Sequence, residues 1–227
     1  MNKVCTNFAF QPVFTGDNKV FAFEALVRPV DTSVEDYLNN NSKYSVEKNT
    51  FFNGINNFLW FGQFDSHLLL NSFPNMGMKE GDYERLENIY DKNILSKLII
   101  EILEPDYGKL SLDHLYLKKK YAQKWGAALA VDDFLPSKEN YFNIRIIEPD
   151  YLKIDRNIIS NINKDIDKQK LLFSLIDFVN DMSKKPTLLA EGIETKEEYE
   201  YLKKLGCIDL FQGFFLSKPI LQEKKCF

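Results

Sequence analysis

Polar side chains stand at the ends of several short apolar runs in this sequence of 227 residues. They are Asn71 after Leu-Leu-Leu, Glu101 after Leu-Ile-Ile, Asp132 and Asp133 after Leu-Ala-Val, Asp155 after Leu-Lys153-Ile, Glu191 after Leu-Leu-Ala, and Gln212 after Leu-Phe. Glu24 lies in a similar way inside the apolar run 20–26. A strand buried on both faces tolerates a carboxylate only at its end or beside a strong partner. The pattern therefore predicts acidic side chains that meet where the strands leave the core.

Such a meeting of carboxylates predicts a site for hard cations. In a parallel barrel the carboxyl ends of all strands open onto one solvated rim, where active sites lie. Lys153 and Arg28 bring only two positive charges to that rim, so most of the carboxylates lack a basic partner there. Oxygen ligands with one amide suit Mg²⁺ or Mn²⁺, and they are numerous enough for two ions that clamp a phosphoryl group.

Each of these residues also has an ordinary structural explanation. A single Asp or Glu after a strand commonly caps the next helix or occupies a turn. Taken alone, Lys153 is typical of a lysine whose stem packs at a rim while its ammonium reaches water, and Gln212 of a loop amide. The recurrence of polar ends on six strands favours one shared site over coincidence.

The segments around these residues alternate between short and long apolar patterns. Runs at 8–14 and 20–30 flank a Thr-Gly-Asp-Asn turn and predict a hairpin. Further strands are expected at 67–71, 97–103, 127–132, 151–155, 187–191 and 210–214, and helices at 45–61, 111–124, 165–182 and 195–206. The last helix begins at Thr195 with a capping box and ends at Gly206. Strands that alternate with helices predict a mostly parallel α/β sheet, and eight strand-like runs favour a closed barrel.

Composition excludes several classes of protein. The 29 basic and 33 acidic residues give a formal net charge of −4, which argues against a general binder of DNA or RNA. The three cysteines cannot all pair, so we do not expect a disulfide scaffold. No apolar run approaches the roughly 20 residues of a membrane span, and the N-terminal residues lack the apolar stretch of a signal peptide. We expect one domain over residues 1–227, cytoplasmic and without a membrane partner.

The motifs follow one another in a fixed order along about residues 8–220. They are Glu24-Ala25-Leu26-Val27-Arg28, Leu70-Asn71, Glu101-Ile-Leu-Glu104, Asp132-Asp133-Phe134, Asp150-Tyr-Leu-Lys153-Ile-Asp155, Ala190-Glu191-Gly192-Ile193-Glu194-Thr195, and Gln212-Gly213-Phe214-Phe215 followed by Ser217-Lys218-Pro219. In this order they resemble the EAL domain family, the phosphodiesterase module for the bacterial second messenger cyclic di-GMP.

The resemblance implies a TIM-like (β/α)8 barrel in which the first strand runs antiparallel. It implies two Mg²⁺ or Mn²⁺ ions held by Glu24, Asn71, Glu101, Asp132, Asp133 and Glu191. It implies catalytic roles for Lys153 near the attacking water, Asp133 and Glu191, and substrate contacts for Gln11, Leu26, Arg28 and Gln212. The implied reaction is hydrolysis of one phosphodiester bond of cyclic di-GMP to linear pGpG.

The sequence departs from the family pattern after Asp133-Phe134. Where the family has Gly-Thr-Gly, this chain has Leu135-Pro136-Ser137 at the start of segment 135–140. Leucine and proline do not easily allow the positive φ angles and close backbone approach that glycine permits, so we expect a stiffer loop that limits activity. In the family this loop shapes the second metal site and couples it to a dimer interface. Glu104 and Asp155 are its expected anchors.

Three functions remain open at this point. The leading hypothesis is an active cyclic di-GMP phosphodiesterase, because no metal ligand of the family pattern is lost. The alternative is a weak or inactive EAL-type protein that serves as a cyclic di-GMP receptor or as a regulator that binds a protein partner, which the altered loop favours. The third is a metal-dependent hydrolase of another phosphodiester. The sequence leaves a homodimer and a protein partner open.

Overall fold

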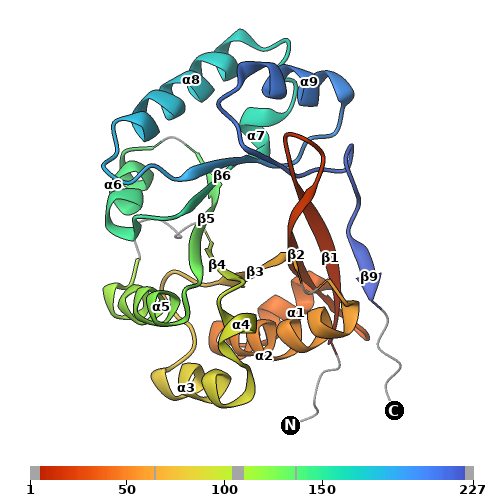
Figure 1. Ribbon diagram of the computed structural model, residues 1–227, viewed down its shortest axis with the longest axis vertical. Coiled ribbons are helices and arrows are strands. Elements are labelled where there is room, and N and C mark those ends of the chain that lie inside the picture. The colour runs from red at the N-terminus through yellow and green to blue at the C-terminus, as the bar shows by residue number, and fades with distance from the viewer. Residues whose placement is uncertain (1–5, 64, 104–109, 136, 223–227) are drawn as a thin grey trace.

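Strands and helices alternate along the computed structural model, which describes residues 6–63, 65–103, 110–135 and 137–222 (Figure 1). The strands are β1 (Thr6–Thr15), β2 (Val20–Pro29), β3 (His67–Ser72), β4 (Leu98–Ile102), β5 (Ala128–Phe134), β6 (Tyr151–Ile154), β7 (Thr187–Ala190), β8 (Leu210–Phe211) and β9 (Ile220–Gln222). The helices are α1 (Val34–Asn40), α2 (Lys43–Phe61), α3 (Glu80–Ile89), α4 (Lys92–Leu95), α5 (Leu112–Trp125), α6 (Lys138–Ile147), α7 (Arg156–Ile159), α8 (Ile166–Asn180) and α9 (Lys196–Leu205).

The strands form a closed barrel. Within the described residues, neighbouring strands follow the order β2-β3-β4-β5-β6-β7-β8-β1, and the pairing of β1 with β2 closes the ring. Strands β2 to β8 run parallel to one another, whereas β1 runs antiparallel to both β2 and β8. The short strand β9 pairs with the free part of β1. The predicted barrel with an antiparallel first strand is therefore confirmed.

The local predictions hold at most element boundaries. The hairpin, the central strands and the four expected helices are all present, whereas α1, α3, α4, α6 and α7 were not anticipated. Strand β8 is shorter than expected, because the chain turns after Phe211 and packs Gly213 against the segment that follows β7. A Cβ atom on Gly213 would lie 2.1 Å from the carbonyl oxygen of Ile193, so only glycine fits at this approach.

The interior of the barrel holds two layers of inward-pointing side chains. The lower layer is an apolar cluster formed by Val13, Ala22, Leu69, Ile99, Ala130, Leu189 and Leu210, with Phe21, Ala128 and Tyr151 packed against it. Side chains two residues apart on a strand point to the same face. The next inward positions are therefore Glu24, Asn71, Glu101, Asp132, Lys153, Glu191 and Gln212, joined by Gln11 from the antiparallel β1. A polar layer thus lies directly above an apolar one.

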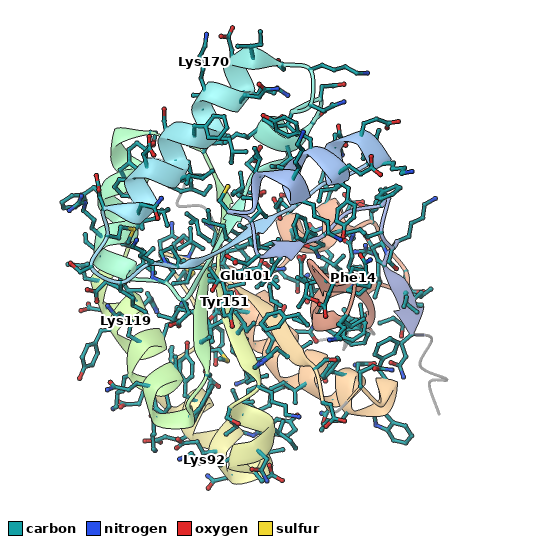
Figure 2. All side chains as sticks on the ribbon, turned by 45° about the horizontal axis from the view of Figure 1, so that its top comes forward. Phe14, Lys92, Glu101, Lys119, Tyr151 and Lys170 are labelled. Atoms are coloured by element: carbon teal, nitrogen blue, oxygen red, sulfur yellow. The ribbon has the colours of Figure 1, made fainter. Side chains whose placement is uncertain are left out.

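The outward faces of the strands are covered by helices. One apolar cluster joins β1 to β4 with α2, α3 and α5, and a second joins β5 to β8 with α6 to α9. Figure 2 shows Glu101 and Tyr151 near the middle of the molecule, whereas Lys92, Lys119 and Lys170 lie at its periphery. Among the described residues, no helix has the length and apolarity needed to cross a membrane.

A buried glutamate holds the loop that follows β7. The Glu198 carboxylate accepts backbone N–H hydrogen bonds from Asn161 at 2.7 Å and from Glu194 and Thr195 at 3.0 Å each. The hydroxyl of Thr195 accepts in turn from the N–H of Glu198, which confirms the predicted capping box. Burial raises the pKa of Glu198, but these backbone hydrogen bonds outweigh it and leave the pKa below its ordinary value.

We predict that Glu198→Gln lowers the free energy of unfolding by about 1–3 kcal/mol near pH 7, because the amide leaves a backbone N–H without an acceptor. A depressed folded-state pKa contributes stability above the unfolded value, near 4.3, that is lost as the pH falls through the folded value. The difference between wild type and variant should therefore shrink below about pH 4.3 in urea titrations. The exposed neighbour Glu197→Gln is the control, and a pH-independent difference would contradict this account.

Candidate active site

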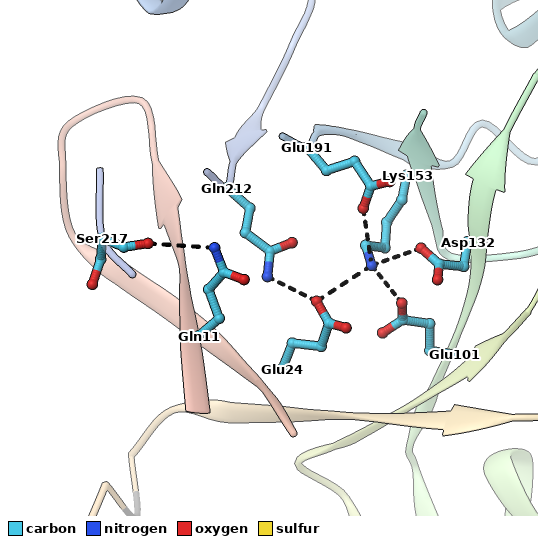
Figure 3. Close-up of polar contacts among 8 residues, drawn as sticks. All are labelled: Gln11, Glu24, Glu101, Asp132, Lys153, Glu191, Gln212 and Ser217. Carbon is cyan, nitrogen blue, oxygen red and sulfur yellow. Dashed lines mark hydrogen bonds and ion pairs between the residues drawn. The ribbon is translucent and has the colours of Figure 1, made fainter. Parts of the chain in front are cut away.

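The Lys153 ammonium lies at the centre of the polar layer, surrounded by carboxylates (Figure 3). Its Nζ atom is 2.7 Å from Asp132 Oδ1, 3.1 Å from Glu191 Oε2 and 3.5 Å from Glu24 Oε2. It also pairs closely with Oε1 of Glu101. These carboxylates come from β2, β4, β5 and the end of β7, so barrel closure is what brings them to one lysine.

Burial decides the electrostatics of this cluster. The Lys153 and Glu101 side chains are 2% and 0% exposed. The prediction that the strand-end side chains lie on a solvated rim is therefore wrong for these two residues. Burial raises the pKa of Glu101 well above its usual value, and the nearby Asp132 carboxylate raises it further. Burial alone would lower the pKa of Lys153, but the surrounding carboxylates outweigh it and hold the lysine protonated. One cation thus faces four carboxylates.

An irregularity in β5 brings a second aspartate to the site. The register between β5 and β6 shifts between Val131 and Phe134. Asp133 lies in this shift with φ of 48°, in the left-handed region that a non-glycine residue adopts only where its surroundings impose it. Carboxylate oxygens of Asp132, Asp133 and Glu191 consequently lie within 4.8 Å of one another. Neighbouring residues on one strand can therefore serve the same ion.

Two oxygen atoms of the polar layer have neither a hydrogen-bond donor nor an ion-pair partner among the described residues. They are Oδ1 of Asn71 and Oε2 of Glu101, and both are buried. The two residues face each other across β3 and β4 in the strand register. A buried acceptor without a donor is costly, so such atoms point to a bound cation or water.

The polar layer opens into a cavity of about 310 Å³. It is lined by Gln11, Glu24, Leu26, Asp132, Asp133, Lys153, Arg156, Glu191, Gly192, Glu194, Gln212, Gly213 and Phe214. Gln212 donates to Glu24 at 2.8 Å, and Gln11 donates to the carbonyl of Ser217 at 3.3 Å (Figure 3). Most of the residues predicted as metal ligands or substrate contacts thus share one cavity.

Arg28 differs from the residues that line the cavity. Its guanidinium donates to the neighbouring Val27 carbonyl at 2.9 Å, and it does not border the cavity. The second basic side chain at the cavity is instead Arg156, which pairs with Glu194 at 2.6 Å. The sequence carried no clear signal for Arg156, because its position depends on how α7 follows β6. Phe214 also borders the cavity and is 54% exposed.

The divergent loop lies beside the end of β5. Leu135 packs against the apolar cluster that joins β5 to β8 with α6 to α9, and its carbonyl accepts a hydrogen bond from the Asn140 side-chain amide at 3.0 Å. Ser137 caps α6. The backbone N–H of Asp155 donates to the Phe134 carbonyl at 3.4 Å, while its side chain caps α7. Pro136 and the second expected anchor, Glu104, lie outside the described residues, so a stiff loop that limits activity stays a prediction.

Comparison with protein families identifies the chain. The model of the EAL domain matches residues 53–219. The chain belongs to the EAL domain family. The matched segment begins after the Glu24-Ala25-Leu26 triplet from which the family takes its name, and the barrel brings Glu24 back beside the matched residues.

Relatives of this EAL domain share only part of their length with it. The chain is 27% identical over 124 residues to the probable cyclic di-GMP phosphodiesterase PdeG of Escherichia coli K12, covering 54% of this chain and 24% of PdeG. It is 36% identical over 87 residues to the cyclic di-GMP phosphodiesterase TpdA of Vibrio parahaemolyticus, covering 38% of this chain and 15% of TpdA. The similarity thus spans a quarter or less of these relatives.

The fold is shared with solved EAL proteins. The c-di-GMP-bound form of a standalone versatile EAL protein from Vibrio cholerae O395 superposes with a TM-score of 0.81 at 22% identity, covering 96% of this chain and 94% of that one. A manganese and cy-diGMP complex of Klebsiella pneumoniae BlrP1 gives 0.76 at 24% identity, covering 97% and 57%. These similarities establish the barrel architecture of the EAL domain.

We predict that Lys153→Met lowers the free energy of unfolding of the metal-free protein by about 3–5 kcal/mol, because it leaves buried carboxylates without their cation. Glu101→Gln should cost far less or raise stability, because burial and the Asp132 carboxylate already disfavour the charged form of Glu101 and raise its pKa. Chemical denaturation of both variants tests this, with the exposed Lys170→Met as the control. Equal stability of Lys153→Met and wild type would contradict the role of Lys153 as the internal counter-ion.

Proposed function

We propose that this EAL domain hydrolyses one phosphodiester bond of cyclic di-GMP to give linear pGpG, with two divalent cations, Mg²⁺ or Mn²⁺. The observation that carries the proposal is the polar layer itself. Six oxygen-bearing side chains of the family pattern occur at one end of one barrel, beside a cavity that holds two basic side chains. Relatives of the domain are cyclic di-GMP phosphodiesterases by name, which supports the choice of substrate.

The chemistry of the donor set fits hard divalent cations. The residues that would hold them are Glu24, Asn71, Glu101, Asp132, Asp133 and Glu191, all of which offer oxygen atoms. The buried acceptors of Asn71 and Glu101 have no donor among the described residues and suit a cation. When bound, two such ions would supply charge that polarises a phosphoryl group and lowers the pKa of bound water toward neutral pH.

The cavity side chains fit an anionic nucleotide with aromatic bases. Arg156 borders the cavity and is half exposed, so its guanidinium can form paired hydrogen bonds with a phosphate. The exposed ring of Phe214 offers a face on which a base can stack. Gln11, Leu26 and Gln212 line the same cavity and can orient the substrate. Arg28 stays a predicted substrate contact that requires its side chain to leave the Val27 carbonyl.

Lys153 is suited to stabilise negative charge and to donate hydrogen bonds, and it is not suited to remove a proton. Its ammonium has three donors and no acceptor, and its carboxylate neighbours keep it protonated. In the hydrolysis a water oxygen bonds to phosphorus, the ester P–O bond breaks, and the departing ribose oxygen takes a proton from solvent water. The Lys153 ammonium can donate a hydrogen bond to the attacking water, while the carboxylate of Asp133 or Glu191 takes up the one proton that this water loses. Hydrogen bonding and charge are thus the contributions of these side chains.

The direct test is conversion of cyclic di-GMP to pGpG by protein freed of metal with a chelator. We expect Mg²⁺ or Mn²⁺ to restore turnover and Ca²⁺ to do so poorly, because Ca²⁺ prefers longer and looser coordination.

Asp132→Ala should lower turnover by at least about 10²-fold while the protein keeps a cooperative thermal transition. Asp167→Asn, which changes a carboxylate that is 87% exposed on α8, is the control and should match wild type.

The outcomes separate the enzyme from its alternatives. Binding of cyclic di-GMP without cleavage at saturating Mn²⁺ would favour a receptor, the function that the divergent loop supports. Cleavage of other phosphodiesters in preference to cyclic di-GMP would favour a different hydrolase. Full activity after exhaustive chelation would contradict the role of the metal ions.

A further inference from the structure

Glu47 on α2 is the one fully buried carboxylate of the described residues that lies outside the polar layer, with 0% exposure. Its Oε2 atom accepts from the Ser72 hydroxyl at 3.0 Å and from the Phe73 N–H at 2.7 Å. Its Oε1 atom accepts from the Met78 N–H at 2.9 Å. A single carboxylate therefore ties together both ends of the segment 72–78, which begins directly after Asn71.

The surroundings of Glu47 are built to receive a charged carboxylate. The Lys118 ammonium of α5, itself 1% exposed, lies 3.7 Å from Oε1 of Glu47. Gly77 packs so closely that a Cβ atom there would lie 2.3 Å from the same oxygen. Burial lowers the pKa of Lys118, and the Glu47 carboxylate opposes that shift. Three hydrogen-bond donors and the Lys118 ammonium contact the Glu47 carboxylate, and Gly77 leaves the space that the carboxylate occupies.

Asn71 lies directly before the segment that Glu47 holds. Its Oδ1 atom is buried and has no hydrogen-bond donor among the described residues, so no hydrogen bond to that oxygen fixes the amide. The strand register with Glu101 fixes the backbone on one side. Strand β4 also holds the Ser72 backbone, whose carbonyl accepts from the N–H of Leu103 at 3.1 Å, and Glu47 adds hydrogen bonds to the Ser72 hydroxyl and the Phe73 N–H. A displacement of Ser72 and Phe73 would turn the Asn71 amide away from the acidic cluster.

We infer that Glu47 is a positioning residue for the metal site, which acts by holding Ser72 and Phe73 so that the Asn71 oxygen faces the cluster. The inference rests on the proposed function, in which Asn71 binds a divalent cation. Residues that orient metal ligands typically change metal affinity by 10–100-fold when they are substituted. Glu47 is therefore expected to control metal affinity although it lies outside the cavity.

Asp82 on α3 offers a matched control. Asp82 pairs with Lys48 of α2 at 2.6 Å and accepts from the Lys79 N–H at 3.1 Å, so it also joins a lysine to a backbone amide. Its contacts lie at the far end of the loop and include neither Ser72 nor Phe73. Asp82→Asn therefore disturbs a comparable ion pair without releasing the residues beside Asn71.

The experiment measures the dissociation constant for Mn²⁺ by electron paramagnetic resonance on chelator-treated protein, well below its melting temperature. Glu47→Gln is expected to weaken Mn²⁺ binding about 10–100-fold, because the amide NH₂ opposes one of the backbone N–H donors. Asp82→Asn is expected to stay within about twofold of wild type, since it removes no group that orients a metal ligand. The double variant Glu47→Gln/Lys118→Met removes the unpaired lysine, so it should regain thermal stability while Mn²⁺ binding stays weak.

The outcomes separate positioning from general stability. Wild-type Mn²⁺ affinity in either variant at Glu47, or recovery of affinity together with stability in the double variant, would overturn the role of Glu47. If Glu47→Gln does not fold, the double variant decides alone. Failure of wild type itself to bind Mn²⁺ would instead overturn the proposed function, and with it this inference.

Discussion

The burial of several carboxylates at one end of a closed barrel is the constraint on which this structure depends. Below the polar layer the barrel is filled with apolar side chains, and the residues Glu24, Glu101 and Asp132 are each less than a tenth exposed. Charges in such a place need opposite charges nearby. Lys153 supplies one positive charge to four carboxylates, and the cluster therefore keeps a strong preference for further cations.

Positions around the cluster are fixed by contacts that lie outside it. The register shift in β5 brings Asp133 next to Asp132, and the carboxylate of Glu198 holds the loop after Glu191. The carboxylate of Glu47 holds the segment after Asn71 on the opposite side. Both supporting glutamates project from helices and accept hydrogen bonds from backbone amides, so the loops that carry the proposed ligands are held by the outer layer of the barrel. The polar side chains inside the barrel therefore do not themselves have to hold these loops in place.

The sequence predicted those parts of the site that follow from local pattern. Asn71, Glu101 and Glu191 end short apolar strands, and the period of two residues along a strand is enough to place them on one face. The capping box of Thr195 and Glu198 is likewise a short-range signal, and the structure confirms it. The polar ends of the strands therefore revealed the site before any tertiary contact was known.

Other parts of the site depend on contacts between distant segments. Glu47 and its partner Lys118 lie 71 positions apart on two different helices, and both side chains are fully buried. Arg156 reaches the cavity only because α7 begins directly after β6. The complete burial of Glu101 was also not predicted. A carboxylate at the end of a strand has the same sequence pattern whether it contacts solvent or a buried lysine. Burial is a property of the closed barrel, and no single segment encodes it.

The central claim is that the acidic cluster binds divalent cations in place of some of its contacts with Lys153. Anomalous X-ray diffraction from crystals of the protein soaked in Mn²⁺ tests this claim most directly. The account predicts anomalous density among Glu24, Asn71, Glu101, Asp132, Asp133 and Glu191, with the Lys153 ammonium moved away from at least one carboxylate. Well-ordered crystals without anomalous density at the cluster, and with Lys153 still paired to all four carboxylates, would contradict it.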